Sequence, residues 1–317
     1  MSSAVTARAF APATVGNIIC GFDVFGLALG EPGDEVEARR RSEPGVVISA
    51  VHGDGGRLPT EAARNVAGVA TSAVLAETGM EDVGIEIEVW KGLPLSGGMG
   101  GSAASAVAAV VAADALLQTN LPAEALLRCA SEGERGPKGD THPDNIAPAL
   151  HGGIVMVRPD EPGIAIPLPV PAGLSVALVH PDLELETNDM RGILPDTLPL
   201  GQAVRQWADC SALVVGLYEE DWDLIAHSLV DRVAEPHRSR FIPGFDAVRS
   251  AGLEAGALGA GLSGSGPSMF ALCRTMADAQ SVATAMADAF GCVGLEGADT
   301  HVSEVAGTGA HLIDDPA

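Results

Sequence analysis

One segment constrains the fold more than any other. Leu93–Ser105 is rich in glycine and runs directly into an alanine- and valine-rich block that ends near Leu117. The segment has four glycines, Gly97, Gly98, Gly100 and Gly101. These glycines leave the backbone free to turn several N–H groups toward one point. The block at 103–113 is apolar on almost every side of a helix, so we expect the rest of the fold to cover it. The chain must therefore build a buried helix that begins at a glycine loop.

The same segment carries no charge. The chain has 42 acidic residues and a formal net charge of −24, yet no charged residue lies between Lys91 and Asp114. Acidic side chains favour the first turn of a helix, and a helix N-terminus without them can receive an external anion. Two interpretations stay open at this point: a phosphate-binding cradle, or a tight turn before a packed helix.

The surrounding pattern is compatible with an anion site. The stretch 84–90 alternates between apolar and polar residues, which predicts a strand, and a strand, a glycine loop and a helix in this order are what such a site needs. The loop is not a Walker A motif, because no Gly-Lys-Ser/Thr follows, and its glycines lack the dinucleotide-binding spacing. No histidine-based metal spacing occurs. What remains is phosphate binding without a Walker lysine.

Composition limits the class of protein. The length of 317 residues allows two domains, and 47% hydrophobic with 19% charged residues is typical of a globular chain. The negative charge argues against nucleic acid and anionic membranes as partners, and the longest apolar run is too short to cross a bilayer. Five scattered cysteines without Cys-x-x-Cys spacing argue against a disulfide framework or a zinc site. With no signal-peptide pattern at the N-terminus, we expect a cytoplasmic protein.

Two further segments place polar residues among apolar ones. A structured loop expected at 11–29 holds Asn17 and Asp23, which are either turn-formers or ligands. The segment 132–148 is expected to be a loop, either solvated or ordered for chemistry, and it holds His142. A third glycine cluster spans 259–268 and precedes an apolar strand. By itself it is weak evidence for a binding site, because glycine loops before strands are typical of ordinary turns.

Periodicity and turn signals predict the other elements. We expect a helix that Thr60 caps, and we place Arg238 on a loop between prolines. The expected ranges are a first strand at 5–10, that capped helix at 60–78, a helix at 123–131, strands at 153–158, 164–168 and 174–180, a helical region at 201–230, a helix at 277–290 and a last strand at 300–306.

Three motifs in this order resemble those of the GHMP kinases, which include galactokinase, homoserine kinase and mevalonate kinase. They are Pro12-Ala-Thr with Asn17, Asp23 and Gly26-Leu-Ala-Leu; the glycine segment itself; and Gly261-Leu-Ser-Gly-Ser-Gly-Pro-Ser. The segments between them are most similar to homoserine kinases: 142–148, 191–195 and 235–245. The resemblance covers essentially the whole chain, and the combination is specific although each glycine motif alone is not.

The resemblance implies a two-domain α+β fold. Residues 1–153 would be an ATP-binding domain of the ribosomal protein S5 domain 2 type, and residues 154–317 a ferredoxin-like α/β sandwich whose last helix or strand can pack back on the first domain. It implies transfer of phosphate from ATP, with Mg²⁺, to the side-chain hydroxyl of L-homoserine in threonine biosynthesis. It also implies a homodimer in the cytoplasm.

Site residues follow from the same resemblance, position by position. The Mg²⁺ ligands would be Ser102 and Glu134. The ATP-binding residues would be Asn65, Lys91, Pro94, Leu95, Ser96, Gly97, Gly98, Met99, Gly100, Gly101, Ser102, Ala103, Ala104, Gly264, Ser265 and Gly266. The homoserine-binding residues would be Asn17, Asp23, His142, Asn145, Thr187, Arg191 and Arg238. The catalytic residues would be Asp23, Asn145 and Glu134.

The sequence also departs from the family pattern. Gly101 stands where the family usually has a second serine. This difference removes one hydroxyl group from the glycine loop, but the backbone N–H remains. Related kinases use an aspartate–lysine pair as a base; here Asn145 and His142 occupy that neighbourhood, so we expect catalysis largely by positioning. Two alternatives stay open: another GHMP small-molecule kinase of the mevalonate, sugar or shikimate type, or an inactive ligand-binding member of the fold.

Overall fold

Helix α2 (Gly101–Leu117) is the buried helix that the sequence predicts. It carries twelve buried residues among its 17, because alanine and valine allow close approach of neighbours on every side. It packs on the strands β1 (Thr6–Gly16) and β2 (Phe25–Arg41) and on the helices α1 (Val66–Thr78) and α3 (Ala123–Glu134). The computed structural model describes residues 6–135, 141–161 and 163–314.

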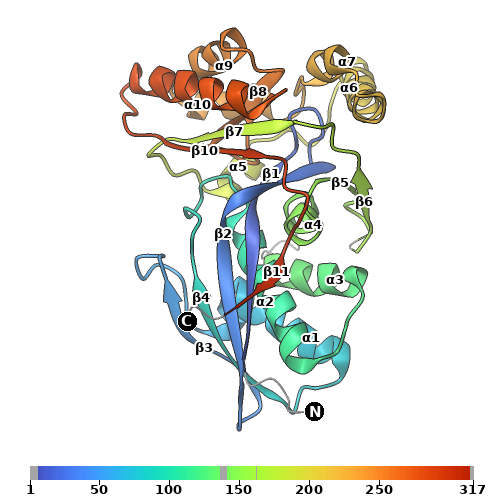
Figure 1. The fold of residues 1–317 in the computed structure, drawn as a ribbon, viewed down its shortest axis with the longest axis vertical. Coiled ribbons are helices and arrows are strands. Elements are labelled where there is room, and N and C mark those ends of the chain that lie inside the picture. Colours follow the sequence, from blue (N-terminus) through green and yellow to red (C-terminus); the bar gives the residue numbers. More distant parts are fainter. Residues whose placement is uncertain (1–5, 136–140, 162, 315–317) are drawn as a thin grey trace.

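The first sheet has seven strands and takes segments from both halves of the chain (Figure 1). Its main path runs β11-β1-β2-β4-β3, and β5 joins it by pairing with the start of β2. Among the described residues β6 pairs only with β5, at the edge of the sheet. The further bounds are β3 (Gly45–His52), β4 (Gly84–Trp90), β5 (Ile154–Val157), β6 (Ala165–Leu168) and β11 (His311–Ile313).

The second sheet has four antiparallel strands in the order β10-β7-β9-β8; β7, β8 and β9 are buried on both faces, whereas the edge strand β10 is partly exposed. Alternate residues of β7 divide between two cores: Val176 and Leu178 join the core of the first sheet, while Ala177 and Val179 face α9 and α10. This explains the nearly continuous apolar runs of β7, β8 and β9. The bounds are β7 (Ser175–His180), β8 (Gly259–Leu262), β9 (Met269–Cys273), β10 (Asp299–Glu304), α9 (Phe245–Glu254) and α10 (Met276–Gly291).

The remaining helices correct two expected loops. The segments expected to be loops around His142 and Arg238 contain α4 (Pro143–His151) and α8 (Glu235–Arg238), and the segment at Thr187, for which no element was expected, forms α5 (Thr187–Gly192). In α4 and α8 the proline lies in the first turn, where its missing N–H costs nothing. The expected helical region at 201–230 is a pair, α6 (Leu200–Glu219) and α7 (Trp222–Ser228). No helix in the described residues is both long and apolar enough to cross a membrane.

Two element boundaries also differ from expectation. Strand β1 continues to Gly16 because a register shift at Pro12 lets pairing with β2 resume at Thr14. Helix α1 begins at Val66, and its cap is Asn65, not Thr60: the Asn65 carboxamide oxygen accepts from the Ala67 N–H at 3.0 Å.

A buried carboxyl beneath the third glycine motif gives a pH-dependent prediction. Glu235 is 5% exposed; burial raises its pKa from 4.5 to about 7, although Arg249 opposes the shift. The folded protein then holds a proton that the unfolded chain has lost, so stability falls as pH rises from about 4.5 to 7, by up to about 1.4 kcal/mol per pH unit. Glu235→Gln should remove this slope in denaturant titrations, and exposed Glu254→Gln should keep it. An unchanged slope in Glu235→Gln would contradict the prediction.

Candidate active site

The three sequence motifs meet at one place. The Thr14 N–H donates to the Met99 carbonyl at 3.1 Å, which joins the first motif to the glycine loop. The third motif holds the loop from the other side, since the Ser263 and Ser268 hydroxyls donate to the Gly98 and Gly97 carbonyls at 2.6 and 2.5 Å. Segments more than 80 residues apart in the chain therefore fix the backbone of the glycine loop.

At two positions in this loop only glycine fits, because of the backbone conformation and because of the close approach of neighbouring atoms. Gly98 and Gly100 have φ values of +73° and +67°, a region that side chains disfavour. A Cβ on Gly100 would lie 2.0 Å from the Thr14 hydroxyl, and a Cβ on Gly98 would lie 2.6 Å from the Ser263 carbonyl. Gly100 ends the loop and caps α2, so the N-terminus of α2 opens into the space beside the loop.

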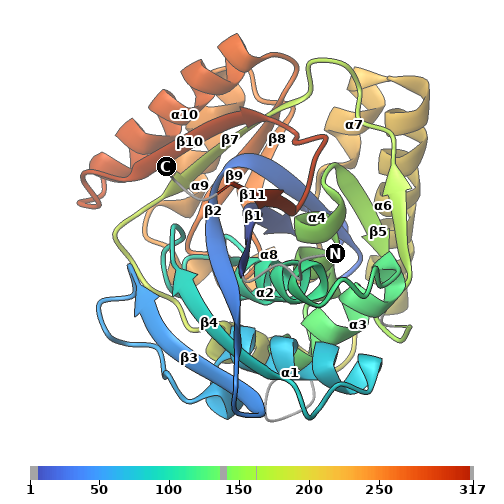
Figure 2. The same ribbon diagram turned by 60° about the horizontal axis from the view of Figure 1, so that its bottom comes forward.

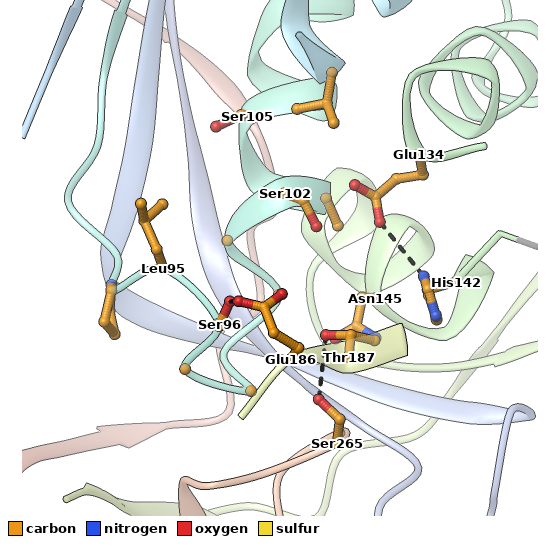
Figure 3. Close-up of a pocket in the computed structure, with 18 of the residues that line it drawn as sticks. Leu95, Ser96, Ser102, Ser105, Glu134, His142, Asn145, Glu186, Thr187 and Ser265 are labelled. Carbon is orange, nitrogen blue, oxygen red and sulfur yellow. Dashed lines mark hydrogen bonds and ion pairs between the residues drawn. The ribbon is translucent and has the colours of Figure 1, made fainter. Parts of the chain in front are cut away.

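That space is a cavity of about 690 Å³, part of which is shown in Figure 3. Nearly all the residues named from the sequence line it; the exceptions are Met99, Ala104 and Gly266. Met99 and Ala104 point into the core instead, with exposures of 1% and 0%. The remaining predicted residues are brought together from the loop between β1 and β2, the cap of α1, the end of β4, the glycine loop, α2, α3, α4 with its cap, α5, α8 and the third motif.

One end of the cavity has side-chain oxygen atoms that could bind a metal ion, beside the N-terminus of α2. Ser102 has no hydrogen-bond partner for its hydroxyl among the described residues, and Figure 3 shows it directed toward the part of the cavity that Glu134 faces. The Glu134 carboxylate lies 3.7 Å from the His142 imidazole, and this contact raises the pKa of His142. A hydroxyl and a buried carboxylate suit a hard divalent cation such as Mg²⁺.

Lys91 lies in the wall of this end and is fully paired. Its ammonium group contacts the Asp34 carboxylate and donates to the Gly101 carbonyl at 2.8 Å and the Ser105 hydroxyl at 2.9 Å. The Lys91 and Asp34 side chains are 3% and 0% exposed. Asp34 also accepts from the Gly92 and Leu93 N–H groups. Lys91 therefore ties the start of α2 to β2 and β4, and its charge is balanced before any ligand binds.

The other end of the cavity is basic. Arg191 donates to the Asp23 carboxylate at 2.5 Å, and both Arg191 and Arg238 lie over the Phe22 ring, at 5.2 and 5.6 Å from its centroid. Arg238 is buried and donates to the Met190 and Gly264 carbonyls. It has no carboxylate at ion-pair distance within the described ranges. Two planar guanidinium groups in this setting can bind a carboxylate.

Amide and acid groups lie between the two ends. The Asn145 carboxamide oxygen accepts from Thr14 at 2.9 Å, and it would lie 3.1 Å from a Cβ on Gly100, so Asn145 adjoins the glycine loop. Asp144 is fully buried, and burial, with Asp23 nearby, raises its pKa to about 6. Its Oδ2 accepts from the Asn17 N–H at 3.2 Å, and Oδ1 has no partner among the described atoms.

Sequence reasoning missed several lining residues. Asp144 and Glu186 are acidic, and a carboxylate beside a proposed anion site is not expected from composition. Glu186 accepts from the Ser96 hydroxyl at 3.1 Å and so links α5 to the glycine loop. The only available signal for Asp144 was its place beside His142 in the motif. The other missed residues are Arg57, Leu58, Pro59, Arg64, Val66, Val89, Ser105 and Asn188.

Comparisons with known proteins agree with the three motifs. Residues 64–153 match the family model of the GHMP kinases N terminal domain, and residues 213–292 match that of the GHMP kinases C terminal. Homoserine kinase of Chlorobium phaeobacteroides is 46% identical over 90% of this chain and 92% of its own length. That of Chlorobaculum tepidum is 43% identical over 97% and 98%. The crystal structure of homoserine kinase from Cytophaga hutchinsonii superimposes with a TM-score of 0.94 at 45% identity, covering 99% of both chains.

Proposed function

The chain belongs to the GHMP kinase family and, within it, to the homoserine kinases, and from this premise we propose how its cavity binds two substrates. The proposed reaction transfers the γ-phosphoryl group of ATP to the side-chain hydroxyl of L-homoserine, giving O-phospho-L-homoserine and ADP. One observation carries the proposal: the N-terminus of α2 and the arginine pair line one cavity, and Asn145, which adjoins the glycine loop, lines it as well.

ATP is assigned to the end formed by the glycine loop. The free N–H groups at the start of α2 and the absence of carboxylates in its first turn favour the phosphates. Asn65 and Lys91 also line the cavity, and we assign both to nucleotide binding. Asn65 would lie beside the adenine, and Lys91 would act through the glycine loop that it supports.

Mg²⁺ is assigned to Ser102 and Glu134, whose oxygens suit it. When bound, the ion neutralises charge on the phosphate oxygens. Lys91 is already balanced by Asp34, so its ammonium group adds little free positive charge at the loop, which supports a need for the ion.

Homoserine is assigned to the basic end. Its carboxylate would bind Arg191 and Arg238, and its ammonium group would approach Asp23, with Asn17, His142 and Thr187 around it. This orientation brings the hydroxyl toward Asn145 and the glycine loop. The protein then contributes alignment of the hydroxyl with the γ-phosphate, which is most of what phosphoryl transfer requires.

Product identification tests the reaction itself. Purified chain, ATP, Mg²⁺ and L-homoserine should yield a phosphate monoester of the amino acid in ³¹P NMR, in equal amount to ADP. ADP without a phosphorylated amino acid would overturn the proposal.

A variant of Arg191 tests the substrate end separately. Arg191→Met should raise KM for homoserine about 10- to 100-fold, since a charged hydrogen bond is worth about 1.5–3 kcal/mol, and leave KM for ATP nearly unchanged. Arg240→Met is the matched control, because Arg240 is exposed and lies against Phe241 outside the cavity. A larger effect on ATP than on homoserine would contradict the assignment.

Three further properties are proposed on the same basis. Residues 1–153 and 154–317 form the ATP-binding and C-terminal domains, which the positions of the two family matches support. The enzyme works in the cytoplasm, and it is a homodimer.

A further inference from the structure

Gln206 is a polar residue on the buried side of α6. It is 6% exposed, and the other buried residues of this helix are Leu213, Gly216 and Leu217. Figure 2 shows α6 beside α7 at the edge of the molecule, and none of its residues, all of which the structure describes, lines the cavity. A buried carboxamide needs hydrogen-bond partners, and those of Gln206 lie in two segments far apart in the chain.

The first segment is the turn at 17–23, between β1 and β2. The Gln206 Nε2 donates to the Cys20 carbonyl oxygen, and the Cys210 thiol donates to the same oxygen at 2.9 Å. Cys20 lies three residues before Asp23, to which we assign the ammonium group of homoserine. Helix α6 therefore holds the backbone of the turn that carries Asp23.

This turn needs support because its backbone is strained. Four of its residues have positive φ values, from +40° to +73°: Asn17, Ile18, Ile19 and Asp23. Side chains disfavour this region, β-branched ones most of all, and such conformations persist only where the surrounding structure fixes them. Two contacts fix the ends of the turn: the Asn17 N–H donates to Asp144 at 3.2 Å, and the Asp23 N–H donates to the Asn17 carboxamide oxygen at 3.0 Å. The bond from Gln206 holds the part between them.

The second segment leads to Arg238. The Gln206 Oε1 accepts from the Arg232 N–H at 2.9 Å. Two more residues of α6 contact Arg232: Gln202 donates to its carbonyl oxygen, and Asp209 accepts from its Nε at 2.9 Å. Arg232 lies six residues before Arg238, so the same helix also holds the segment that precedes this arginine.

Asp231 connects that segment to α8. Its carboxylate accepts from three backbone N–H groups at 2.6 to 3.0 Å, those of Val233, Ala234 and Glu235. Glu235 is the first residue of α8, and Arg238 is the last. Arg238 is 4% exposed and donates to two backbone carbonyls at 3.1 Å. The position of its guanidinium group therefore depends on the segment that α6 holds.

We infer that Gln206 is a positioning residue whose carboxamide sets the separation between the turn that carries Asp23 and the helix that carries Arg238. Homoserine has its ammonium group and its carboxylate on one carbon atom, so the groups that bind them must stand at one fixed separation. A side chain bonded to both segments fixes that separation without touching the substrate. The inference rests on the proposed assignment of homoserine to the basic end of the cavity.

Gln206→Met tests the inference, because methionine keeps the approximate length and volume of the side chain and loses both hydrogen bonds. We expect KM for L-homoserine to rise about 5- to 30-fold, the effect of losing one or two ordinary hydrogen bonds that hold the binding groups in place. KM for ATP should change by less than about twofold. An unchanged KM for L-homoserine in the folded variant would overturn the inference.

Leu217→Ala is the matched control for a loss of stability. Leu217 is on the buried side of the same helix and is 1% exposed, so its truncation should destabilise the fold and leave both KM values near those of the wild type. If Leu217→Ala raises KM for L-homoserine as much as Gln206→Met does, any weakening of α6 has this effect and the inference is wrong.

Gln202→Met decides the question if Gln206→Met does not fold. It removes only the bond to the Arg232 carbonyl, from a side chain that is partly exposed, and should raise KM for L-homoserine about two- to fivefold. In that case, an unchanged KM in Gln202→Met would overturn the inference.

An inhibitor separates binding from phosphoryl transfer. L-2-Aminobutyrate has both charged groups of homoserine and lacks the hydroxyl, so its inhibition constant should rise by the same factor as KM in each variant. A rise in KM without a matching rise in the inhibition constant would contradict a positioning role. No turnover of L-homoserine by the wild type would overturn the proposed function and this inference together, whereas wild-type turnover with an unchanged KM in folded Gln206→Met would overturn the inference alone.

Discussion

Glu134→Gln is expected to lower kcat about 10²- to 10³-fold, the size of effect seen when one group that stabilises transition-state charge is removed. Glutamine keeps the shape of the side chain but loses the negative charge that we assign to Mg²⁺. Because that charge is needed to hold the ion, the variant should also require more Mg²⁺ for half-maximal rate. Steady-state kinetics at several Mg²⁺ concentrations measures both effects.

The matched control for this variant lies on the same helix. Glu132 is two residues away, about half exposed and paired with Arg135, so Glu132→Gln should keep nearly full activity. Glu134 is 4% exposed and contacts His142, so both variants should be checked for folding by thermal unfolding. A folded Glu134→Gln with wild-type kcat and an unchanged Mg²⁺ requirement would remove Glu134 from the proposed ion site.

Asp34→Ala is expected to lower the free energy of unfolding by about 3–5 kcal/mol. Asp34 is completely buried and accepts four hydrogen bonds, from Lys91, Ser105 and the N–H groups of Gly92 and Leu93. Removing the carboxylate leaves the Lys91 ammonium buried without its counter-charge. Urea titration followed by fluorescence or circular dichroism measures the change.

Two comparisons separate this pair from an ordinary ion pair. Glu43→Ala breaks the exposed pair with Arg41, where Glu43 is 77% exposed, and should cost less than about 1 kcal/mol. Asp34→Asn with Lys91→Met should be less destabilising than the sum of the single changes, because neither charge is then left alone. Strict additivity, or a cost below about 1 kcal/mol for Asp34→Ala, would contradict the description of the pair.

The features that the sequence predicted well are local in the chain. The glycine loop, the buried helix α2 and the strand before it are contiguous, and their composition alone indicates them. The α+β class and the kinase family are confirmed by the two family models and by the solved homoserine kinase. The three motifs that predicted them line one cavity.

The features that the sequence did not predict depend on distant pairing. Lys91 was assigned to the nucleotide side, but its contact with Asp34, 57 residues earlier, arises only when β2 pairs with β4. Prolines at the starts of α4 and α8 suggested loops, so Arg238 was placed on a loop although a short helix carries it. Asp144 was missed because nothing local shows that its carboxylate is buried against Asn17.

The most direct test of the account is ADP release, in one coupled assay with ATP and Mg²⁺, over L-homoserine, mevalonate, galactose and shikimate. We assign Arg191, Arg238 and Asp23 to recognition of an amino acid, so we predict turnover with L-homoserine and background rates with the other three. Turnover of mevalonate, galactose or shikimate at a rate equal to or above that of L-homoserine would contradict it.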